Sequence, residues 1–442
     1  MWDDRRPGYS RLERSAPFCY CFYCERTDRS RASLTHWDLS AAVRELGDES
    51  QMRVTMIVTG FPSADDPVSG IFNLRSAQGL SRIAKVRVVH LRSWLPSRAW
   101  SLLSEVEGIS VCTLAIPQLP MFRRRNVELY RRLAWPSLET ILRDSDLIHS
   151  VGGSFAGVVA VNWAQLAGVH HVMQITSEIE LASNARRPTN EEMKHIHAIA
   201  CNSAALASQF LVLYPTAPNV RAVYRGVDLQ RFSPGLQACS QQDECRFLFL
   251  GGFPEYPTLP HRRNTKGGET LLAAWLAAEK ELPSSASLTI AGPQSTSPDV
   301  LRWRAGLRRP ERVHLLGAIS PDAVPTHIRE SDAVLVPSLQ EGLPNVVLEA
   351  AACGRAVLAS NLWGTAEIVV ESQTGVLLPA GDADAWRSAL IRFSLNRACL
   401  LTMGRNARQR TELFFDSNKY PMQMVDLYAA AIREPLMIAR IS

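Results

Sequence analysis

One local pattern recurs along this chain: a short apolar run, then a turn rich in glycine or proline, then a longer run with helical character. The pattern begins at Arg53 and restarts near Phe247. Strands that alternate with helices imply a parallel sheet covered on both faces, because each return crossover carries a helix. The sequence therefore predicts two doubly wound α/β units in tandem, and its 442 residues suffice for two cores of ordinary size.

The expected domain boundaries follow from where this pattern starts and stops. Residues 1–51 lack a hydrophobic period and are rich in Arg, Asp and Ser, so we expect a poorly ordered N-terminal extension. Residues 52–225 and 226–405 form the two expected domains. Residues 406–442 are expected to form a C-terminal helical segment that packs back toward the first domain, with helical character from Gly404 to Ala431. The expected strands cover residues 54–58, 86–91, 147–151, 172–175, 198–202 and 220–223 in the first domain and 247–250, 288–291, 313–316, 333–336 and 356–359 in the second.

The junction of the two domains falls in the run RGVDLQRFSP, which begins at Arg225. Its glycine favours a turn, Asp228 is suited to cap a helix, and Phe232 can anchor the segment by packing. We interpret the run as a structural hinge. The crevice between the domains is then the expected ligand site, because open parallel sheets bind ligands at the carboxyl ends of their strands.

The composition argues against several classes of protein. A formal net charge of +5 is too mild to indicate a nucleic-acid-binding protein. There is no apolar run of the roughly 18 residues that suggest a membrane span, and no secretory leader, so we expect a cytoplasmic protein. Nine dispersed cysteines indicate reduced thiols. We interpret the cluster of Cys19, Cys21 and Cys24 as chance rather than as a metal site, because no second cysteine pair accompanies it.

The run PSLQEGLPNVVLEAAACG, from Pro337 to Gly354, is the most informative segment. It follows a buried strand and predicts a turn and then a helix over residues 345–352. Such an arrangement presents backbone N–H groups on which an anion can bind. Glu341 and Glu349 stand eight positions apart, which spans roughly 12 Å of helix. Each acid alone has a structural interpretation, as a partner of the helix dipole or as a polar residue beside an apolar face, but their joint spacing favours a binding site.

This segment resembles the E-x7-E signature of retaining glycosyltransferases with the GT-B fold, specifically of glycosyltransferase family 4. The resemblance covers roughly residues 53–431, strongly in the second domain and loosely in the first. It implies two Rossmann-like parallel-sheet domains that face each other across a cleft. It also implies transfer of a sugar from a UDP- or GDP-sugar to a hydroxyl acceptor, in polysaccharide, glycolipid or glycoconjugate biosynthesis. In this interpretation Glu341 lies beside the transferred sugar and Glu349 binds the ribose.

Lys266 lies in the run NTKGG at the entrance of an expected helix, where glycines let a ligand approach the backbone. A solvated lysine is the alternative, but its position in the same domain as the two acids favours a catalytic contact with the donor diphosphate. The family that this chain resembles usually has Gly-Arg directly after the preceding strand, whereas Gly251 and Gly252 stand here. Arg262 or Arg263, on the long loop that follows, could supply the missing phosphate contact.

Further donor contacts are implied by the resemblance. The strand end near residue 316 resembles the segment that lies against the nucleotide base, and the run WGTAE resembles a second support of the donor pocket. A core role for Glu367 in that run is an equally open alternative. Beyond Glu349, the expected donor-binding residues are Gly342, Leu343, Pro344, Asn345, Gly252, Arg262, Arg263, Gly317, Ile319, Gly364 and Glu367.

The run Asp382-Ala383-Asp384 only superficially matches the Asp-x-Asp metal motif of the other glycosyltransferase fold. It follows Pro379 and begins an expected helix, so helix capping explains it better. We therefore predict no catalytic metal and no cofactor apart from the nucleotide-sugar co-substrate. The diphosphate leaving group would then be stabilised by Lys266 and by helix-end N–H groups.

Three segments of the first domain are candidate site residues. Ser69 and Gly70 resemble the glycine loop that approaches the donor diphosphate or the acceptor. His149 ends a strand at the same expected edge and is a candidate for binding or proton transfer, although a buried structural histidine is the commoner case. The family commonly has His-Gly after the next strand. This chain has Thr176 and Glu178 there, which suggests a different acceptor or sugar.

Basic and aromatic residues are mixed over residues 122–135, on an expected helix. Such a helix could dock on an anionic inner membrane face where lipid-linked acceptors reside, although a solvated face is commoner. The expected partners are a nucleotide-sugar donor and a saccharide or lipid-linked acceptor, without nucleic acid. A sugar-nucleotide epimerase of the same architecture and a non-catalytic binding protein remain alternatives. The sequence leaves the base, the sugar and the acceptor open.

Overall fold

The computed structural model describes residues 51–63, 66, 69–92, 100–115, 123–181, 187–235, 244–253 and 265–436. The expected N-terminal extension up to residue 50, with its three clustered cysteines Cys19, Cys21 and Cys24, lies outside the described residues. Arg262 and Arg263 also lie outside them. Residues 51–442 form one compact unit.

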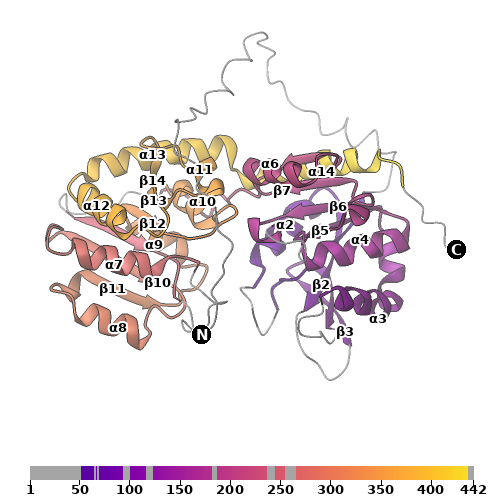
Figure 1. The fold of residues 1–442 in the computed structure, drawn as a ribbon, viewed down its shortest axis with the longest axis horizontal. Helices are drawn as coiled ribbons and strands as arrows, with labels where there is room; N and C mark the ends of the chain where they lie inside the picture. The colour runs from indigo at the N-terminus through magenta and orange to yellow at the C-terminus, as the bar shows by residue number, and fades with distance from the viewer. Residues whose placement is uncertain are drawn as a thin grey trace, which may run out of the picture. The chain divides into compact units, whose positions relative to one another are not determined.

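The first half of this unit is built on an eight-stranded sheet with the order β3-β4-β2-β1-β5-β6-β7-β8 (Figure 1). Its strands pair in parallel except for β3, which runs antiparallel to β4 at one edge. The strands are β1 (Arg53–Val58), β2 (Lys85–Arg92), β3 (Trp100–Val106), β4 (Ile109–Ala115), β5 (Leu147–Val151), β6 (His170–Ile175), β7 (Ala198–Cys201) and β8 (Val220–Ala222).

The second half is built on a six-stranded sheet, β11-β10-β9-β12-β13-β14, in which the pairs are all parallel. The strands are β9 (Cys245–Phe249), β10 (Ala286–Ala291), β11 (Val313–Gly317), β12 (Ala333–Val336), β13 (Ala356–Ser360) and β14 (Gly375–Leu378). The prediction of two doubly wound parallel-sheet units is therefore confirmed.

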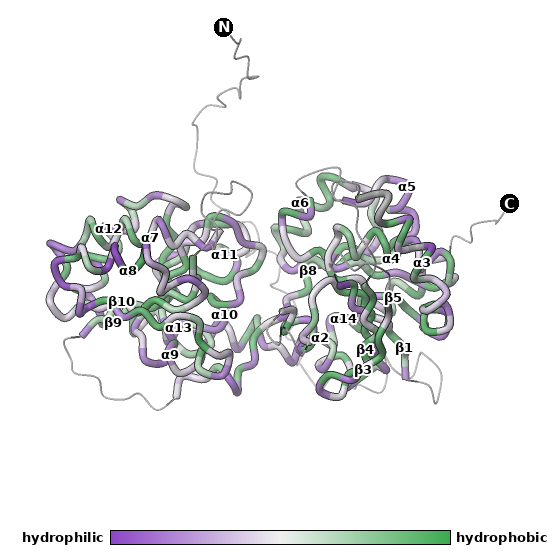
Figure 2. Tube along the Cα trace, turned by 90° about the horizontal axis from the view of Figure 1, so that it is seen from below, coloured by the Kyte–Doolittle hydropathy of each residue, from purple (hydrophilic) through white to green (hydrophobic). Residues whose placement is uncertain are grey.

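Helices cover both faces of each sheet. They are α2 (Ile71–Ser81), α3 (Arg123–Arg143), α4 (Phe155–Ala167), η1 (Glu178–Glu180), α5 (Asn190–Met193), α6 (Ala204–Leu213), α7 (Gly268–Ala278), α8 (Pro298–Ala305), η3 (Pro310–Arg312), α9 (Val324–Glu330), α10 (Asn345–Ala352), α11 (Trp363–Ile368), α12 (Ala383–Ser394), α13 (Arg397–Phe414), η4 (Ser417–Lys419) and α14 (Tyr420–Ile432). Side chains along β1 alternate between the helices on one face of the first sheet and those on the other face. Val54, Met56 and Val58 pack in the cluster that contains α2 and α14, whereas Ile57 packs with α3 and α4. Figure 2 shows the strongly hydrophobic course of β4 and β5.

Three strands of the structure, β3, β4 and β14, were not expected from the sequence. The β3–β4 hairpin turns at Glu107 and Gly108, which both have positive φ, at 46° and 81°, as a two-residue hairpin requires. Its exposed edge strand carries Leu102 and Leu103 on the surface, so the hydrophobic signal of a buried strand is missing. The short strand β14 was also missed.

Residues 404–431 are helical for the most part, but the structure divides this segment between α13, which ends at Phe414, and α14, which begins at Tyr420. The chain leaves α13 at Phe415 and continues through Asp416 into η4 and α14. The break has a tertiary cause, because the Val227 N–H donates to the Phe415 carbonyl at 2.8 Å and the Ser417 N–H donates to the Val227 carbonyl at 3.1 Å. The chain therefore follows the hinge at this point instead of continuing the helix.

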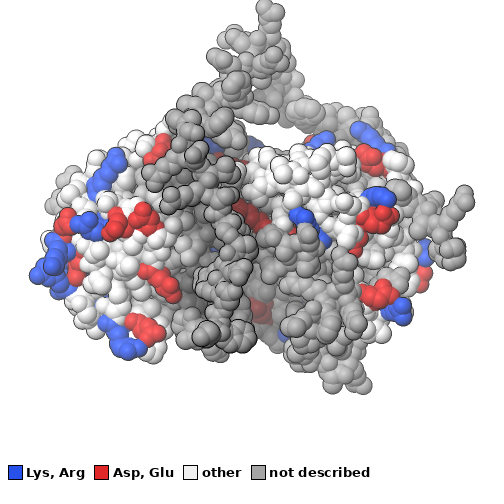
Figure 3. Space-filling model, viewed as in Figure 1, with Lys and Arg blue, Asp and Glu red and all other residues white. Residues whose placement is uncertain are grey.

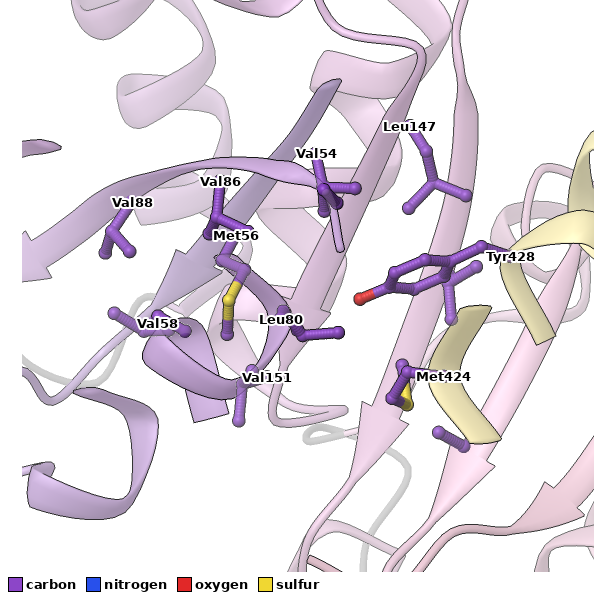
Figure 4. Packing of buried hydrophobic residues seen from close by; sticks show 14 of the residues in the cluster. Val54, Met56, Val58, Leu80, Val86, Val88, Leu147, Val151, Met424 and Tyr428 are labelled. Atoms are coloured by element: carbon purple, nitrogen blue, oxygen red, sulfur yellow. The ribbon is translucent and has the colours of Figure 1, made fainter. Parts of the chain in front are cut away.

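Helix α14 packs on the first sheet. Met424 and Tyr428 lie in one buried cluster with Leu80 of α2 and Leu147 of β5 (Figure 4). At roughly 25 cal/mol per Å² of apolar area, such buried side chains each contribute on the order of 2 kcal/mol. The C-terminal segment is thus part of the core of the first half.

The strand orders define where a ligand can bind. The first sheet reverses its winding between β1 and β5, and the second reverses between β9 and β12. Loops that leave the carboxyl ends of such neighbouring strands diverge and open a crevice. In the second sheet these loops are the segments after Phe249 and after Val336.

The surface of the described residues carries mixed charges. On the face seen in Figure 3, Lys and Arg are interspersed with Asp and Glu. A search of the described residues finds no helix that combines the length and the apolar character needed to span a bilayer.

Candidate functional site

A cavity of about 650 Å³ lies at the reversal point of the second sheet, a volume that suits a small-molecule ligand. Its walls come from the ends of β9 and β12, the start of α10, the segment near residue 319, the hinge and the start of α2. The residues around it are Ile71, Phe72, Arg75, Arg231, Phe232, Phe249, Leu250, Gly251, Lys266, Ile319, Pro321, Val324, Leu335, Val336, Ser338, Glu341, Leu343, Pro344, Asn345, Val346 and Glu349. The structure therefore brings Glu341, Glu349 and Lys266 together.

Glu341 and Lys266 form an ion pair at one end of the cavity. The Lys266 Nζ lies 2.7 Å from the Glu341 Oε1, and the Ser338 hydroxyl donates to the same oxygen at 2.8 Å. The Glu341 side chain is 12% exposed and that of Lys266 is 49% exposed. The lysine can therefore exchange this partner for an incoming anion at small desolvation cost.

Gly267 explains how Lys266 reaches this position. It has a φ of 69°, and a Cβ there would lie 1.8 Å from the Pro337 carbonyl oxygen. Only glycine allows the start of α7 to approach the end of β12 so closely. The Leu339 N–H donates to the Thr265 carbonyl at 2.7 Å and joins the two loops.

Glu349 lies on α10 at another part of the same cavity. Burial raises the pKa of its carboxyl group, while the positive charges of Arg75 and Arg231 act in the opposite direction. A partly buried carboxylate between two guanidinium groups is well placed to accept hydrogen bonds from ligand hydroxyl groups.

Arg75 and Arg231 are functional candidates that the sequence analysis missed. Arg75 projects from the second turn of α2, and burial lowers its pKa, as does the charge of Arg231. Arg231 lies in the hinge run and donates to the Pro321 carbonyl at 2.7 Å and to Asp322 at 3.1 Å. No motif marks either residue. The helical spacing of Ile71, Phe72 and Arg75 places them on one face of α2. This spacing is the feature of the sequence that could have indicated Arg75.

Of the described donor-binding residues expected near the base or in the turn after β9, only one lines the cavity. Ile319 lines the cavity. Gly317 ends β11 with a φ of 72°, and its carbonyl accepts the Gly292 N–H at 2.7 Å. Gly252 packs against Pro293 instead of lining the cavity, where its neighbour Gly251 does.

Of the expected donor-binding residues directly after Glu341, three line the cavity and one does not. Leu343, Pro344 and Asn345 line the cavity, and Pro344 precedes α10 without a side-chain cap, so the first N–H groups of the helix are available to a ligand. Gly342 instead packs closely, since a Cβ there would lie 2.4 Å from the Thr176 carbonyl oxygen of the first half.

Gly364 and Glu367 do not line the cavity. A Cβ at Gly364 would lie 1.4 Å from the Gly342 carbonyl oxygen, so this glycine serves close packing. The Glu367 carboxylate accepts the backbone N–H groups of Ala204 and Ala205 at 2.9 and 2.6 Å and the Tyr224 hydroxyl at 2.7 Å. It caps α6 and joins the two halves, which matches the structural alternative for this residue.

In the first half, Gly70 precedes α2 with a φ of 65°, and a Cβ there would lie 2.2 Å from the Gly60 backbone. Ser69 is exposed beside it, and its N–H donates to Asp66 at 3.0 Å. Neither residue lines the cavity, although the next two residues do. This loop therefore positions the start of α2.

Thr176 and Glu178 lie on the loop after β6 and do not line the cavity either. The buried Glu180 carboxylate, which the sequence analysis missed, organises this loop. It accepts the Gly153 N–H at 2.5 Å, the Thr176 N–H at 3.3 Å and the Thr176 hydroxyl. Burial raises the pKa of Glu180 and that of Glu178. Because Thr176 touches Gly342, Glu180 supports the loop that carries Glu341.

His149 lies away from the cavity. Its ring is fully buried in β5, and its Nδ1 lies 2.8 Å from the Tyr428 hydroxyl of α14. Burial lowers its pKa to about 3, with a smaller contribution from Arg225, so the ring is neutral near pH 7. These contacts fit the structural alternative, because a buried neutral ring joined to α14 cannot reach a ligand in the cavity.

The acidic run at Asp382 is a helix cap, as expected. Its Oδ1 accepts the N–H groups of Asp384 and Ala385 at 3.1 and 3.0 Å. The Asp228 Oδ1 also accepts two N–H groups, those of Gln230 and Arg231, but the segment that follows is a turn and not the expected helix. In the described ranges no three His, Cys, Asp or Glu side chains gather as a metal-ligand set. Independence from metal stays a prediction.

Comparison with known proteins places these features in context. Residues 240–396 match the family model described as glycosyl transferases group 1. The chain is 27% identical over 314 residues to the D-inositol 3-phosphate glycosyltransferase of Saccharomonospora viridis, which covers 65% of this chain and 70% of that protein. It is 23% identical over 319 residues to the UDP-Gal:alpha-D-GlcNAc-diphosphoundecaprenol alpha-1,3-galactosyltransferase of Escherichia coli, covering 69% of this chain and 81% of that protein.

The fold is also similar to that of solved structures. Sucrose-phosphate synthase from Thermosynechococcus elongatus matches with a TM-score of 0.64 at 20% identity, over 86% of this chain and 98% of that one. The two-sheet architecture is therefore the GT-B fold.

Proposed function

We propose that this chain is a glycosyltransferase that moves a sugar from a nucleotide-diphospho-sugar to a hydroxyl acceptor, with retention of configuration, as a member of glycosyltransferase family 4. The observation that carries the proposal is the single cavity that holds Glu341, Lys266 and Glu349 at the reversal point of a parallel sheet. The similarity to group 1 glycosyltransferases over residues 240–396 covers the same half of the chain.

Glu341 and Lys266 act at the reacting end. Glu341 accepts hydrogen bonds from the hydroxyl groups of the transferred sugar, and Lys266 leaves Glu341 to neutralise the departing diphosphate. Because the two side chains are only 2.7 Å apart, both can act on the bond between the sugar and the diphosphate. The uncapped N–H groups that begin α7 and α10 add positive potential for the diphosphate. This set requires no metal ion.

Glu349 accepts hydrogen bonds from the ribose, and the segment at Ile319 lies against the base. Arg75 and Arg231 replace the arginine that the segment after β9 lacks, since both flank Glu349. The donor then spans the cavity from Lys266 to Ile319, with a volume of about 650 Å³ available.

The donor is a UDP-sugar and the acceptor is a saccharide or lipid-linked hydroxyl compound. Support comes from the Escherichia coli relative, whose name contains UDP-Gal and a diphosphoundecaprenol-linked sugar. Contact with an anionic membrane through α3 is part of the proposal, because Arg132 and Leu133 are both exposed on that helix. Sedimentation with anionic liposomes at low and high salt tests this contact, and the loss of binding at high salt is the expected result.

The donor is tested by thermal unfolding with UDP, GDP and ADP. A ligand at 100 times its Kd stabilises the folded state by about 2.7 kcal/mol, and UDP should give the largest shift. Incubation with the matching UDP-sugar alone should release free nucleotide slowly. Formation of an epimer would instead identify an isomerase.

Two acid variants test the residue roles. Glu341→Gln should lower turnover at least a hundredfold, in the range of a lost transition-state contact, and preserve UDP binding. Glu349→Gln should weaken UDP binding. Glu412→Gln, on the surface of α13, is the matched control. Unchanged turnover in Glu341→Gln would contradict the enzyme assignment, and loss of activity on adding EDTA would contradict metal independence.

A further inference from the structure

A second pocket, of about 280 Å³, adjoins the cavity. One wall is α2, another is the segment 225–230, and the start of η4 and α14 closes it. Phe72, Arg75, Asn345 and Glu349 line both spaces. We call it the hinge pocket, because residues 225–230 connect the two sheets. None of the roles proposed above uses its far side.

One face of α2 shapes the pocket. Phe72, Arg75, Ser76, Gly79 and Arg82 line it at spacings of three and four residues, which places them on one side of the helix. Gly79 carries no side chain, and a Cβ there would meet the Pro421 ring at 3.2 Å. The glycine therefore leaves space between the two arginines.

Three guanidinium groups line the pocket, and the partners recorded for two of them are neutral. Arg82 donates to the Asn418 side-chain oxygen at 3.2 Å, and Arg225 donates to the Asn73 side-chain oxygen at 3.2 Å. The Nε of Arg225 has no hydrogen-bond partner among the described residues. Burial lowers the pKa of Arg225 and of Arg75, which shows that both charges have lost hydration.

Two carboxylates line the pocket, and a third, Glu180, attracts Arg225 from the loop after β6 while its oxygens accept from Gly153 and Thr176. They compensate the charge of the arginines only in part. Asp228 is exposed, and its Oδ1 accepts the N–H groups of Gln230 and Arg231 at 2.9 and 3.0 Å. Glu349 lies where the pocket meets the cavity. Arg82 and Arg225 therefore retain donors for a ligand of negative charge.

We propose that the hinge pocket binds the phosphate group of a small phosphorylated molecule through Arg82 and Arg225, which line this pocket but not the cavity and so leave Arg75 to the donor. Guanidinium groups match the geometry of phosphate oxygens and donate two parallel hydrogen bonds. The volume of about 280 Å³ is less than half that of the cavity, so it suits a molecule smaller than a nucleotide-sugar. The phosphate belongs either to a free effector or to the acceptor.

Inorganic phosphate is the probe for this site, measured by isothermal titration of the full chain. Binding should be saturable, and Arg82→Ala should weaken it at least tenfold, with Arg82→Lys between the two. Arg82 is exposed, so its replacement should not impair folding, which thermal unfolding without phosphate verifies. The matched control is Arg302→Ala, an exposed arginine that contacts Asp299 on α8 and should bind phosphate like the unmodified chain.

Competition separates this site from the donor cavity. Phosphate should still bind when the protein is saturated with UDP, and it should bind equally well to Lys266→Met. Displacement of phosphate by UDP, equal affinity in Arg82→Ala, or no saturable binding would each overturn the proposal. These outcomes do not depend on activity, so they remain distinct from a failure of the proposed transferase function.

The rate of hydrolysis of UDP-glucose and UDP-galactose without an acceptor distinguishes the two sources of phosphate. This part of the experiment rests on the proposed function. A rate that changes as phosphate saturates the site identifies an effector, since the pocket contacts both α2 and the hinge. An unchanged rate with the same phosphate occupancy assigns the site to a phosphate carried by the acceptor. Both results retain the site.

Discussion

Replacement of Lys266 by methionine should separate catalysis from stability. The Lys266 ammonium is half exposed and contacts Glu341 at 2.7 Å, so the pair contributes only about 0.2–1 kcal/mol to folding. Glu341 keeps its hydrogen bond from Ser338 after the change. The free energy of unfolding should therefore fall by less than about 1 kcal/mol.

The effect on turnover should be much larger. The diphosphate gains negative charge as the bond to the sugar breaks, and Lys266 is the cation placed beside that bond in the proposed mechanism. Removal of one preorganised donor at such a position costs about 2.7–4 kcal/mol of transition-state stabilisation, or a factor of about 100–1,000 in kcat. The side chain of Lys266 packs beside Gly251, since a Cβ built at Gly251 would lie 3.1 Å from the Lys266 Cβ. Methionine keeps this Cβ and the apolar stem, so the packing is preserved.

The assay combines kcat at saturating UDP-sugar with urea unfolding of the same preparations. Lys194→Met is the matched control, because Lys194 also forms a 2.7 Å ion pair and is 53% exposed, but it follows the last residue of α5 and does not line the cavity. It should change neither quantity. A Lys266→Met protein with kcat within a factor of about three of the unmodified chain would refute the role of this lysine. A loss of more than about 2 kcal/mol in stability would refute the exposure argument.

Further predictions concern the supports of the site. Gly364→Ala should destabilise the protein by at least about 1–3 kcal/mol, because its Cβ would lie 1.4 Å from the Gly342 carbonyl oxygen. Gly306→Ala, with 3.5 Å of space, is the control in thermal unfolding. Glu180→Gln should lower kcat about tenfold or more by loosening the loop that touches Gly342, with UDP affinity unchanged; an equal loss of affinity would argue against a positioning role. The pKa of His149 falls to about 3 on folding, so its contribution to stability is complete above pH 6.5 and is lost as the pH falls toward 3. At pH 5 the loss is about 2 kcal/mol, and His149→Gln should make the stability curve measured by urea unfolding less steep between pH 6.5 and 4. Part of the slope should remain, because burial also lowers the pKa of His90, His171 and His197.

The sequence determined the parts of this protein that depend on local pattern. Strands β5 and β12 and helices α7 and α10 begin and end where the apolar runs, glycines and prolines predict, because periodicity and turn chemistry act over a few residues. The spacing of Glu341 and Glu349 was likewise readable, since both residues lie on one strand–turn–helix unit. Asp382 was correctly interpreted as a helix cap for the same reason.

The tertiary structure decided which of these residues share a cavity. Arg75 joins Glu349 only because α2 and α10, which are far apart in the sequence, both line the same cavity. His149 and Glu367 were expected as site residues. In the structure His149 is buried beside Tyr428, and Glu367 caps α6, so both make contacts away from the cavity. The break before α14 also depends on a distant partner, Val227. Such outcomes depend on which surfaces meet when the sheets pack, and local sequence does not encode the identity of a distant neighbour.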